Sequence, residues 1–251
     1  MKQFGTVLAL ALALMTTGCG KTSSSTPPAS TAGQAQGVFS GTTSTGLSFQ
    51  SIILPNDTFY AIYGTTIGNV LYVSGMMTGQ GASNNGTYAA TVTDFYSSGS
   101  TFTGSLAATY VAGVSVSGTV SESGNSNVTF NGAVGSISSF NYGTPALLSG
   151  ISGTWTGTLM DGSTAVVNIN ASGTFSGSDS GCSFSGSITP DSSGKNFFKV
   201  SLTYGPSPCL SPNQTQAGIG VDYLLSDGVT HQLLAGVASG TSFGTVFVAN
   251  R

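Results

Sequence analysis

Charged residues are scarce in this chain. Of its 251 residues, five are Lys or Arg and eight are Asp or Glu, or 5 % of the sequence against about 25 % in average globular proteins. No Lys or Arg occurs between Thr22 and Gly194, so that span has no cluster of basic side chains to neutralise a phosphate backbone. The composition therefore predicts no nucleic-acid partner.

Side chains for acid–base catalysis are equally few. The only histidine, His231, precedes Ser242, although the G-x-S-x-G motif at Gly240–Gly244 needs a following helix and a later His to act as a nucleophile elbow. A catalytic triad would require His231 to lie beside both a Ser and an Asp such as Asp222 or Asp227. We instead interpret the motif as a hairpin turn and His231 as a residue at the start of a strand. We predict a protein that is not an enzyme, with no catalytic residue, no cofactor and no metal site.

Two carboxylates are candidates for binding a ligand. Most Asp residues stand in turn contexts, where the side chain caps its own backbone. Asp94 and Asp222 fall instead within predicted strands. Such a residue can face a barrel mouth and bind a ligand, although it more often faces water.

Long hydrophobic runs are absent apart from Val7–Met15. At 1.5 Å per residue this run would extend about 14 Å as a helix, half of a ~30 Å hydrocarbon core, so it is too short to cross a membrane. It follows Lys2 and precedes the residues Thr16, Thr17, Gly18 and Cys19. We interpret residues 1–18 as a signal peptide.

The end of this segment resembles the bacterial lipobox, with Thr16 where Leu is usual. The resemblance implies that Cys19 becomes the lipidated first residue of the mature protein, because more than one acyl chain anchors a protein stably. Gly20, which is not Asp, implies the outer membrane of a Gram-negative cell. A plain secreted protein is the alternative. Residues 19–36, with the lipidated Cys and a Ser/Thr/Pro/Ala-rich stretch, then form a flexible tether with a reach of about 20 to 24 Å.

Cysteine is rare as well. Beyond Cys19 the chain has only Cys182 and Cys209, and one even pair in an exported protein predicts one disulfide. Its loop of about 28 residues would contribute about 3.5 kcal/mol to stability. Metal binding by the pair is the alternative, which lacks nearby His and Cys partners.

The body of the chain contains an internal repeat. Gly37–Thr42 aligns with Gly153–Thr158, and Asp57–Phe59 aligns with Gly173–Phe175, at the same offset of 116 residues and with an aromatic residue in register each time. We therefore expect two β units, at residues 37–132 and 151–251, joined by a linker at 133–150.

Alternation of apolar and polar residues with period two predicts half-buried strands in both units. In the second unit we expect strands near 153–160, 163–170, 173–179, 182–189, 196–204, 215–225, 229–238 and 241–250. In the first unit we expect them near 37–43, 47–54, 57–63, 68–77, 86–95, 101–110, 114–121 and 126–132. No helix is expected after the signal peptide. The prediction is an all-β protein of two antiparallel meanders of about eight strands each, barrel-like, with β-sandwiches as the alternative.

Two resemblances to known families support barrels. Gly153-Thr154-Trp155 is similar to the G-x-W opening of lipocalins, in which the Trp closes one barrel end and a later Arg packs over it; here the only Arg of the body is Arg251, at the terminus. The lipobox, the polar tether, the Gly-x-aromatic openings and the strand number together resemble surface lipoproteins of the transferrin-binding type. That resemblance implies small eight-strand barrels and no particular partner.

These observations lead to a hypothesis with two alternatives. We expect a lipid-anchored envelope protein with a non-catalytic binding or shielding role toward a protein or glycan. The sequence does not determine whether the protein faces the periplasm or the cell surface. The alternatives are a carrier of a small apolar ligand in a barrel interior and a purely structural lipoprotein. The aromatic candidates for partner contact are Tyr60, Tyr63, Tyr72, Tyr96 and Tyr142.

Overall fold

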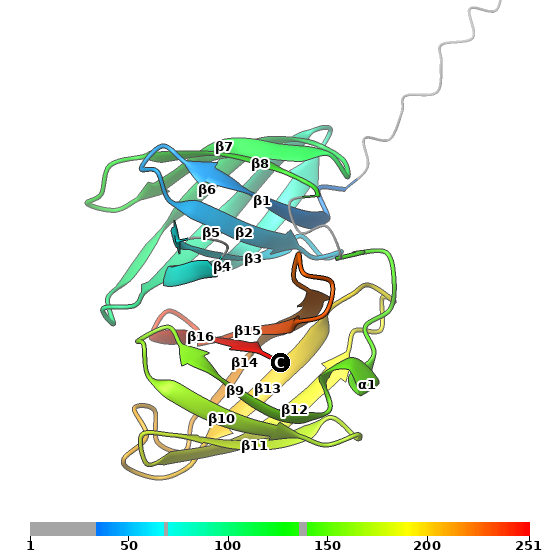
Figure 1. Ribbon diagram of the computed structural model, residues 1–251. Coiled ribbons are helices and arrows are strands. Elements are labelled where there is room, and N and C mark those ends of the chain that lie inside the picture. The colour runs from blue at the N-terminus through cyan, green and yellow to red at the C-terminus, as the bar shows by residue number, and fades with distance from the viewer. Residues whose placement is uncertain (1–33, 68–69, 136–139) are drawn as a thin grey trace, which may run out of the picture. The chain divides into compact units, whose positions relative to one another are not determined.

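The computed structural model describes residues 34–67, 70–135 and 140–251, all within one compact unit (Figure 1). The predicted signal peptide, Cys19 and nearly all of the predicted tether lie outside these residues. In the described part of the chain, no helix has the length and apolar character needed to cross a bilayer.

The first eight strands form a closed antiparallel barrel, in which each strand pairs with the next and the last pairs with the first. Ser40 to Thr43 of the first strand lie opposite Ala133 to Phe130 of the eighth and so close the barrel. The strands are β1 (Gly37–Thr43), β2 (Ser48–Ile53), β3 (Thr58–Ile67), β4 (Val70–Asn84), β5 (Thr87–Tyr96), β6 (Thr101–Val111), β7 (Ser115–Glu122) and β8 (Val128–Ala133).

The second eight strands form another closed barrel of the same kind. Here Phe247 to Ala249 of the last strand lie opposite Leu159 to Gly157 of the first. The strands are β9 (Gly153–Leu159), β10 (Thr164–Ile169), β11 (Thr174–Asp179), β12 (Cys182–Pro190), β13 (Phe198–Tyr204), β14 (Thr215–Leu224), β15 (His231–Ser239) and β16 (Phe243–Asn250). The all-β prediction with two eight-strand barrels is confirmed, and the sandwich alternative is wrong.

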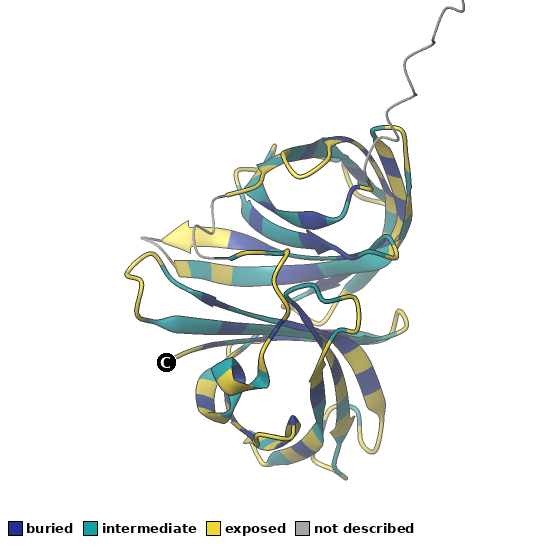
Figure 2. Ribbon diagram, turned by 90° about the vertical axis from the view of Figure 1, so that its right-hand side faces the viewer, coloured by how far each residue is buried: buried dark blue, intermediate teal, exposed yellow. Residues whose placement is uncertain are grey.

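Side chains alternate between the barrel interiors and the outer faces, and Figure 2 shows the resulting bands of buried and exposed residues along the strands. In β10, for example, Ala165, Val167 and Ile169 are buried, while Thr164 and Asn168 are exposed. Successive residues of a strand point to opposite faces, so a period of two in the sequence produces one apolar and one polar face.

Glycine permits close contact between neighbouring strands. A Cβ atom at Gly218 of β14 would overlap the carbonyl oxygen of Gly236, and one at Gly186 of β12 would overlap that of Ser201. Any side chain at these positions would push the strands apart, so glycine is needed where the sheet coils strongly.

Two local predictions were wrong. The strand expected at 68–77 is β4, which continues to Asn84 because its first part pairs with β3 and its later part with β5. The chain also contains a one-turn helix, α1 (Leu148–Ile151), although no helix was expected after the signal peptide. Ile151 is fully buried, so this turn packs its last residue into the second barrel.

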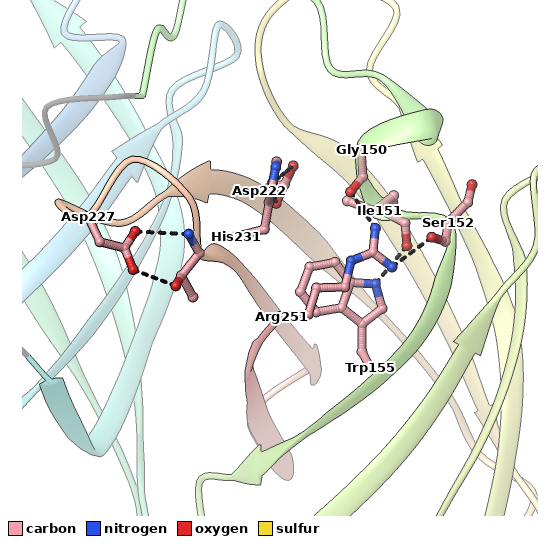
Figure 3. Close-up of polar contacts among 9 residues, drawn as sticks. Gly150, Ile151, Ser152, Trp155, Asp222, Asp227, His231 and Arg251 are labelled. Atoms are coloured by element: carbon pink, nitrogen blue, oxygen red, sulfur yellow. Dashed lines mark hydrogen bonds and ion pairs between the residues drawn. The ribbon is translucent and has the colours of Figure 1, made fainter.

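The C-terminal barrel is sealed at one end by Trp155 and Arg251 (Figure 3). Trp155 is fully buried, and its indole N–H donates to the carbonyl oxygen of Ile151 at 2.7 Å. The guanidinium carbon of Arg251 lies 4.2 Å from the centre of the Trp155 ring, and the same side chain donates to the carbonyl oxygens of Ser152 and Gly150 at 2.7 and 2.9 Å. Pairing of β16 with β9 thus brings Arg251, at the end of the chain, to the Trp at the start of the barrel.

Residues on the outer faces of the two barrels join in shared apolar clusters. Ile52 of β2 packs with Phe197 and with Ile219 of β14, and Met76 of β4 packs with Val246 of β16. All five side chains are at most 7 % exposed. Contact between barrels explains why β14 and β16 carry apolar residues on faces that would otherwise meet water.

The seal predicts a stability contribution from Arg251. We expect Arg251→Gln to lower the free energy of unfolding by about 1–2 kcal/mol, because it removes a cation–π contact and charge-assisted hydrogen bonds to two carbonyl oxygens. Urea unfolding of the whole chain measures the loss. Lys199→Gln is the control, since it removes a largely exposed cation from its ion pair with Asp191 at the surface, a kind of pair worth about 0–1 kcal/mol. Equal losses in the two variants would contradict a role for the seal.

Candidate functional site

The C-terminal barrel encloses a cavity of about 310 Å³. Side chains from every strand of the barrel except β14 line it, and most of them are apolar, including Val167, Phe175, Ile188, Val200, Leu233 and Phe247. Pockets that take small organic ligands have this size and character, with a few polar groups that orient the ligand.

The cavity opens at the end of the barrel opposite the Trp155 seal. This end, called the mouth below, is formed by the β9–β10, β11–β12, β13–β14 and β15–β16 connections. Each connection, or a residue next to it, contributes to the cavity wall: Asp161, Ser180, Pro208, Leu210 and Phe243.

Two carboxylates, Asp161 and Asp179, stand side by side at the mouth and line the cavity. The Ser163 hydroxyl lies 2.7 Å from a carboxylate oxygen of Asp161 and 3.1 Å from one of Asp179, so one side chain bridges the two. The Ser163 backbone N–H and the Ser180 hydroxyl donate to Asp161 and Asp179 at 2.9 and 2.8 Å. These contacts fix two negative charges beside an apolar space.

An aromatic group lies next to these carboxylates. The ring of Tyr204 makes edge contacts with Phe184 and Phe243, with centroids 6.3 and 6.1 Å away. Burial, together with the charges of Asp179 and Asp161, raises the pKa of Tyr204 to about 12. The tyrosine therefore stays neutral, and the electrostatic field of both carboxylates reaches it.

A disulfide holds the β13–β14 connection over the mouth. Cys182 at the start of β12 is bonded to Cys209, and Cys182 itself lines the cavity. The predicted pairing is present in the structure. The disulfide fixes Pro208 and Leu210 beside the opening, where Leu210 is 79 % exposed.

Gln216 adds an unusual polar group to this barrel. It lies directly opposite Leu202, a cavity residue, so its side chain faces the interior, as those of inward-facing residues on β14 do. Gln216 is 1 % exposed, and neither its amide nitrogen nor its amide oxygen has a partner among the described residues. A buried amide without partners costs free energy, on the order of 1–3 kcal/mol.

The N-terminal barrel has a cavity of its own, of about 260 Å³. It also opens at the end of the β1–β2 and β7–β8 connections, and Asp94, Glu122, Tyr63 and Tyr96 line it. The Tyr63 hydroxyl donates to Asp94 at 2.9 Å, and Tyr96 lies in edge contact with Tyr63 at 6.1 Å. Tyr96 ends β5 just as Tyr204 ends β13, so the two barrels place a tyrosine at corresponding points.

Asp94 is the most deeply buried charged side chain described, at 0 % exposed. Burial raises its pKa to about 8, and the hydrogen bond and charge of neighbouring Glu122 add to the rise, while the bond from Tyr63 opposes it. Asp94 is therefore largely protonated at neutral pH. Of the two strand carboxylates considered from the sequence, this one faces a barrel cavity.

The other strand carboxylate, Asp222, pairs with His231 at the sealed end of the C-terminal barrel (Figure 3). His231 Nδ1 lies 3.1 Å from Asp222 Oδ1. Asp227 instead caps its own turn, accepting from Val229 and Thr230. Ser242 lies in the β15–β16 turn, at the far end of β15 from His231, about 26 Å along the strand. No Ser–His–Asp triad with Ser242 can form.

The tyrosines considered as partner contacts have different environments. Tyr63 and Tyr96 line the N-terminal cavity, Tyr60 packs in the cluster between the barrels, and the Tyr142 hydroxyl donates to the Ile53 carbonyl at 3.1 Å. Tyr72 alone of the five is largely exposed, at 58 %. Over the described ranges, no group of three or more His, Cys, Asp or Glu side chains is placed to hold a metal ion.

Comparison with known proteins finds similar structures only. No family model and no curated protein matches the sequence. Two structures of transferrin binding protein B are similar. One is isotype 1 from serogroup B Neisseria meningitidis, 11 % identical over 82 % of this chain and 58 % of that chain, with a TM-score of 0.25. The other is a mutant of the vaccine antigen from Haemophilus parasuis Hp5, 8 % identical over 82 % and 66 %, with a TM-score of 0.29.

This chain thus spans less than two thirds of either similar structure. At these identities and TM-scores the likeness says nothing of family, partner or activity.

Asp94 predicts a pH dependence of stability. Its folded-state pKa of about 8 lies above the ordinary value of 3.8, so the folded protein binds more protons between these values and loses stability as pH rises through that window. We expect Asp94→Asn to remove this loss, which amounts to about 1.4 kcal/mol per pH unit at most.

Urea unfolding at pH values from 5 to 9 measures the effect. Asp227→Asn is the matched control, because that exposed carboxyl has a lowered pKa and stays ionised over this range. Parallel stability curves for the Asp94→Asn variant and the unaltered protein would show that Asp94 titrates normally.

Proposed function

We propose that this protein is a non-catalytic binding protein of the cell envelope whose C-terminal barrel holds a small, largely apolar molecule. The observation that carries the proposal is the cavity of about 310 Å³, which has an apolar wall, a sealed end and an open mouth. Burying apolar surface contributes about 25 cal/mol per Å² to binding, so such a wall favours an apolar guest.

The geometry of the polar residues supports a binding role without catalysis. His231 pairs with Asp222 at the sealed end, away from the mouth. The polar side chains that line the cavity are those of Asp161, Asp179, Ser180, Tyr204 and Thr245. The hydroxyl groups of Ser163 and Ser180 donate to the two carboxylates without the histidine that a Ser–His–Asp triad uses as its base.

A lipid anchor would place this binding protein at the membrane. Cys19 would carry the acyl chains, and residues 20–36 would lead from the anchor to β1, which begins at Gly37. The residue after the Cys is Gly, which favours the outer membrane. Membrane attachment would keep the barrels within about 20 to 24 Å of the lipid surface.

A protein partner is the second candidate function. The hairpin of β3 and β4 carries three large apolar side chains that are more than half exposed, Ile67, Val70 and Tyr72. Grouped apolar side chains in water often mark a contact with another protein, and apolar groups favour a protein over a glycan.

The cavity proposal is tested with the neutral fluorescent probe N-phenyl-1-naphthylamine. We expect the full-length protein without its signal peptide to bind it, and Ala235→Phe to weaken binding at least tenfold, because Ala235 lines the cavity and a phenyl ring there would fill it. Ala89→Phe, on the exposed outer face of β5, is the matched control.

Near-ultraviolet circular dichroism checks that both variants fold, and Ala235→Leu provides a smaller obstruction. Equal affinities for Ala235→Phe and Ala89→Phe, or no binding by the unaltered protein, would overturn the cavity proposal and leave the partner contact as the function.

The anchor is tested by the mass of the protein from membrane fractions. We expect a mass increased by three acyl chains and their glyceryl group, and we expect Cys19→Ala to lose both the increase and membrane association. An unmodified soluble protein would contradict the anchor while leaving the cavity proposal intact.

A further inference from the structure

The mouth of the C-terminal barrel carries negative charge that no basic residue of the described chain balances. Asp161 and Asp179 lie there, whereas the described cations lie elsewhere: Lys199 pairs with Asp191 at 2.8 Å, Lys195 lies over the Tyr142 ring, and Arg251 covers Trp155. Like charges held side by side repel each other, and a cation between them relieves that repulsion.

The two carboxylates keep capacity for further hydrogen bonds. Oδ1 of Asp161 accepts from the Ser163 backbone and hydroxyl, while within the described residues nothing donates to its Oδ2. The Ser163 hydroxyl has one proton and therefore donates to Asp161 or to Asp179 at a given moment. A donor group arriving at the mouth would find unoccupied oxygen lone pairs on both side chains.

The aromatic rings beside the carboxylates favour the same kind of group. Tyr204, Phe184 and Phe243 form a chain of edge contacts along this part of the cavity wall. The face of an aromatic ring attracts a cation, by about 0.5–1 kcal/mol in water and more when the pair is desolvated.

The cavity itself is the second observation that points to a ligand. Its wall is mostly apolar, and Asp161 and Asp179 are among the residues that line it, so a guest that fills the cavity meets both carboxylates at the mouth.

We propose that the guest of the C-terminal barrel is an apolar molecule ending in a protonated amine, with its apolar body in the cavity and its ammonium group at the mouth near Asp161 and Asp179. The inference rests on the proposed ligand-binding function and adds the chemical class of the ligand. Because the other end of the barrel is sealed by Trp155 and Arg251, the guest enters with its apolar end first.

Three probes with the same chain and different head charge test the inference: octylamine, octanol and octanoate, each competing with N-phenyl-1-naphthylamine at pH 7. We expect octylamine to bind at least tenfold more tightly than octanol and octanoate to bind most weakly. The advantage of octylamine is expected to shrink as sodium chloride is raised, because salt screens charges at the mouth.

Two double variants assign the effect to the mouth. Asp161→Asn with Asp179→Asn is expected to reduce octylamine affinity to that of octanol measured in the same variant. Asp191→Asn with Asp227→Asn removes the same charge from the opposite end of the barrel and is expected to keep the preference.

The outcomes separate the two proposals. Binding of the neutral probe with no preference for octylamine, or a preference that both double variants reduce equally, overturns the amine inference and keeps the cavity function. Absence of binding by every probe overturns both. A preference for octylamine lost only in the Asp161 and Asp179 double variant supports the inference.

Discussion

Closure of each sheet on itself is the constraint on which the rest of the molecule depends. Pairing of β8 with β1 and of β16 with β9 closes both sheets, so that only the tip of the β3–β4 hairpin extends beyond its neighbouring strands. Many β proteins protect an edge with charged side chains, and this chain has only 13 of them. Closure of the sheets therefore protects their edges where charged side chains are too few to do so. It also creates the two enclosed barrel interiors.

The C-terminal barrel is functionally asymmetric because its two ends are built differently. At one end the first strand begins with Trp155 and the last ends with Arg251, and strand pairing brings the two together. At the other end, four connections surround an opening that contains two carboxylates and a disulfide-held segment. In the proposed function, the apolar wall would provide affinity for a guest and the polar mouth would orient it.

The two barrels accommodate their acidic side chains in different ways. In the N-terminal barrel Asp94 is neutral at pH 7, because burial beside Glu122 favours the protonated acid. In the C-terminal barrel the carboxylates remain at the mouth, where Ser163 and solvent stabilise their charge. The two copies of the repeat therefore share the barrel architecture and differ in the polar groups of their interiors.

The sequence by itself determined the strands, the repeat and the cysteine pair, because alternation and turn residues act over a few neighbours. Asp161 lies in a turn, as the sequence predicts for most Asp residues, yet nothing local showed that this turn meets Asp179 at a cavity. It also could not show that Ile219 faces the other barrel while Gln216 faces inward. Only the tertiary structure decided these points, since strand closure and barrel contact join residues far apart in the chain.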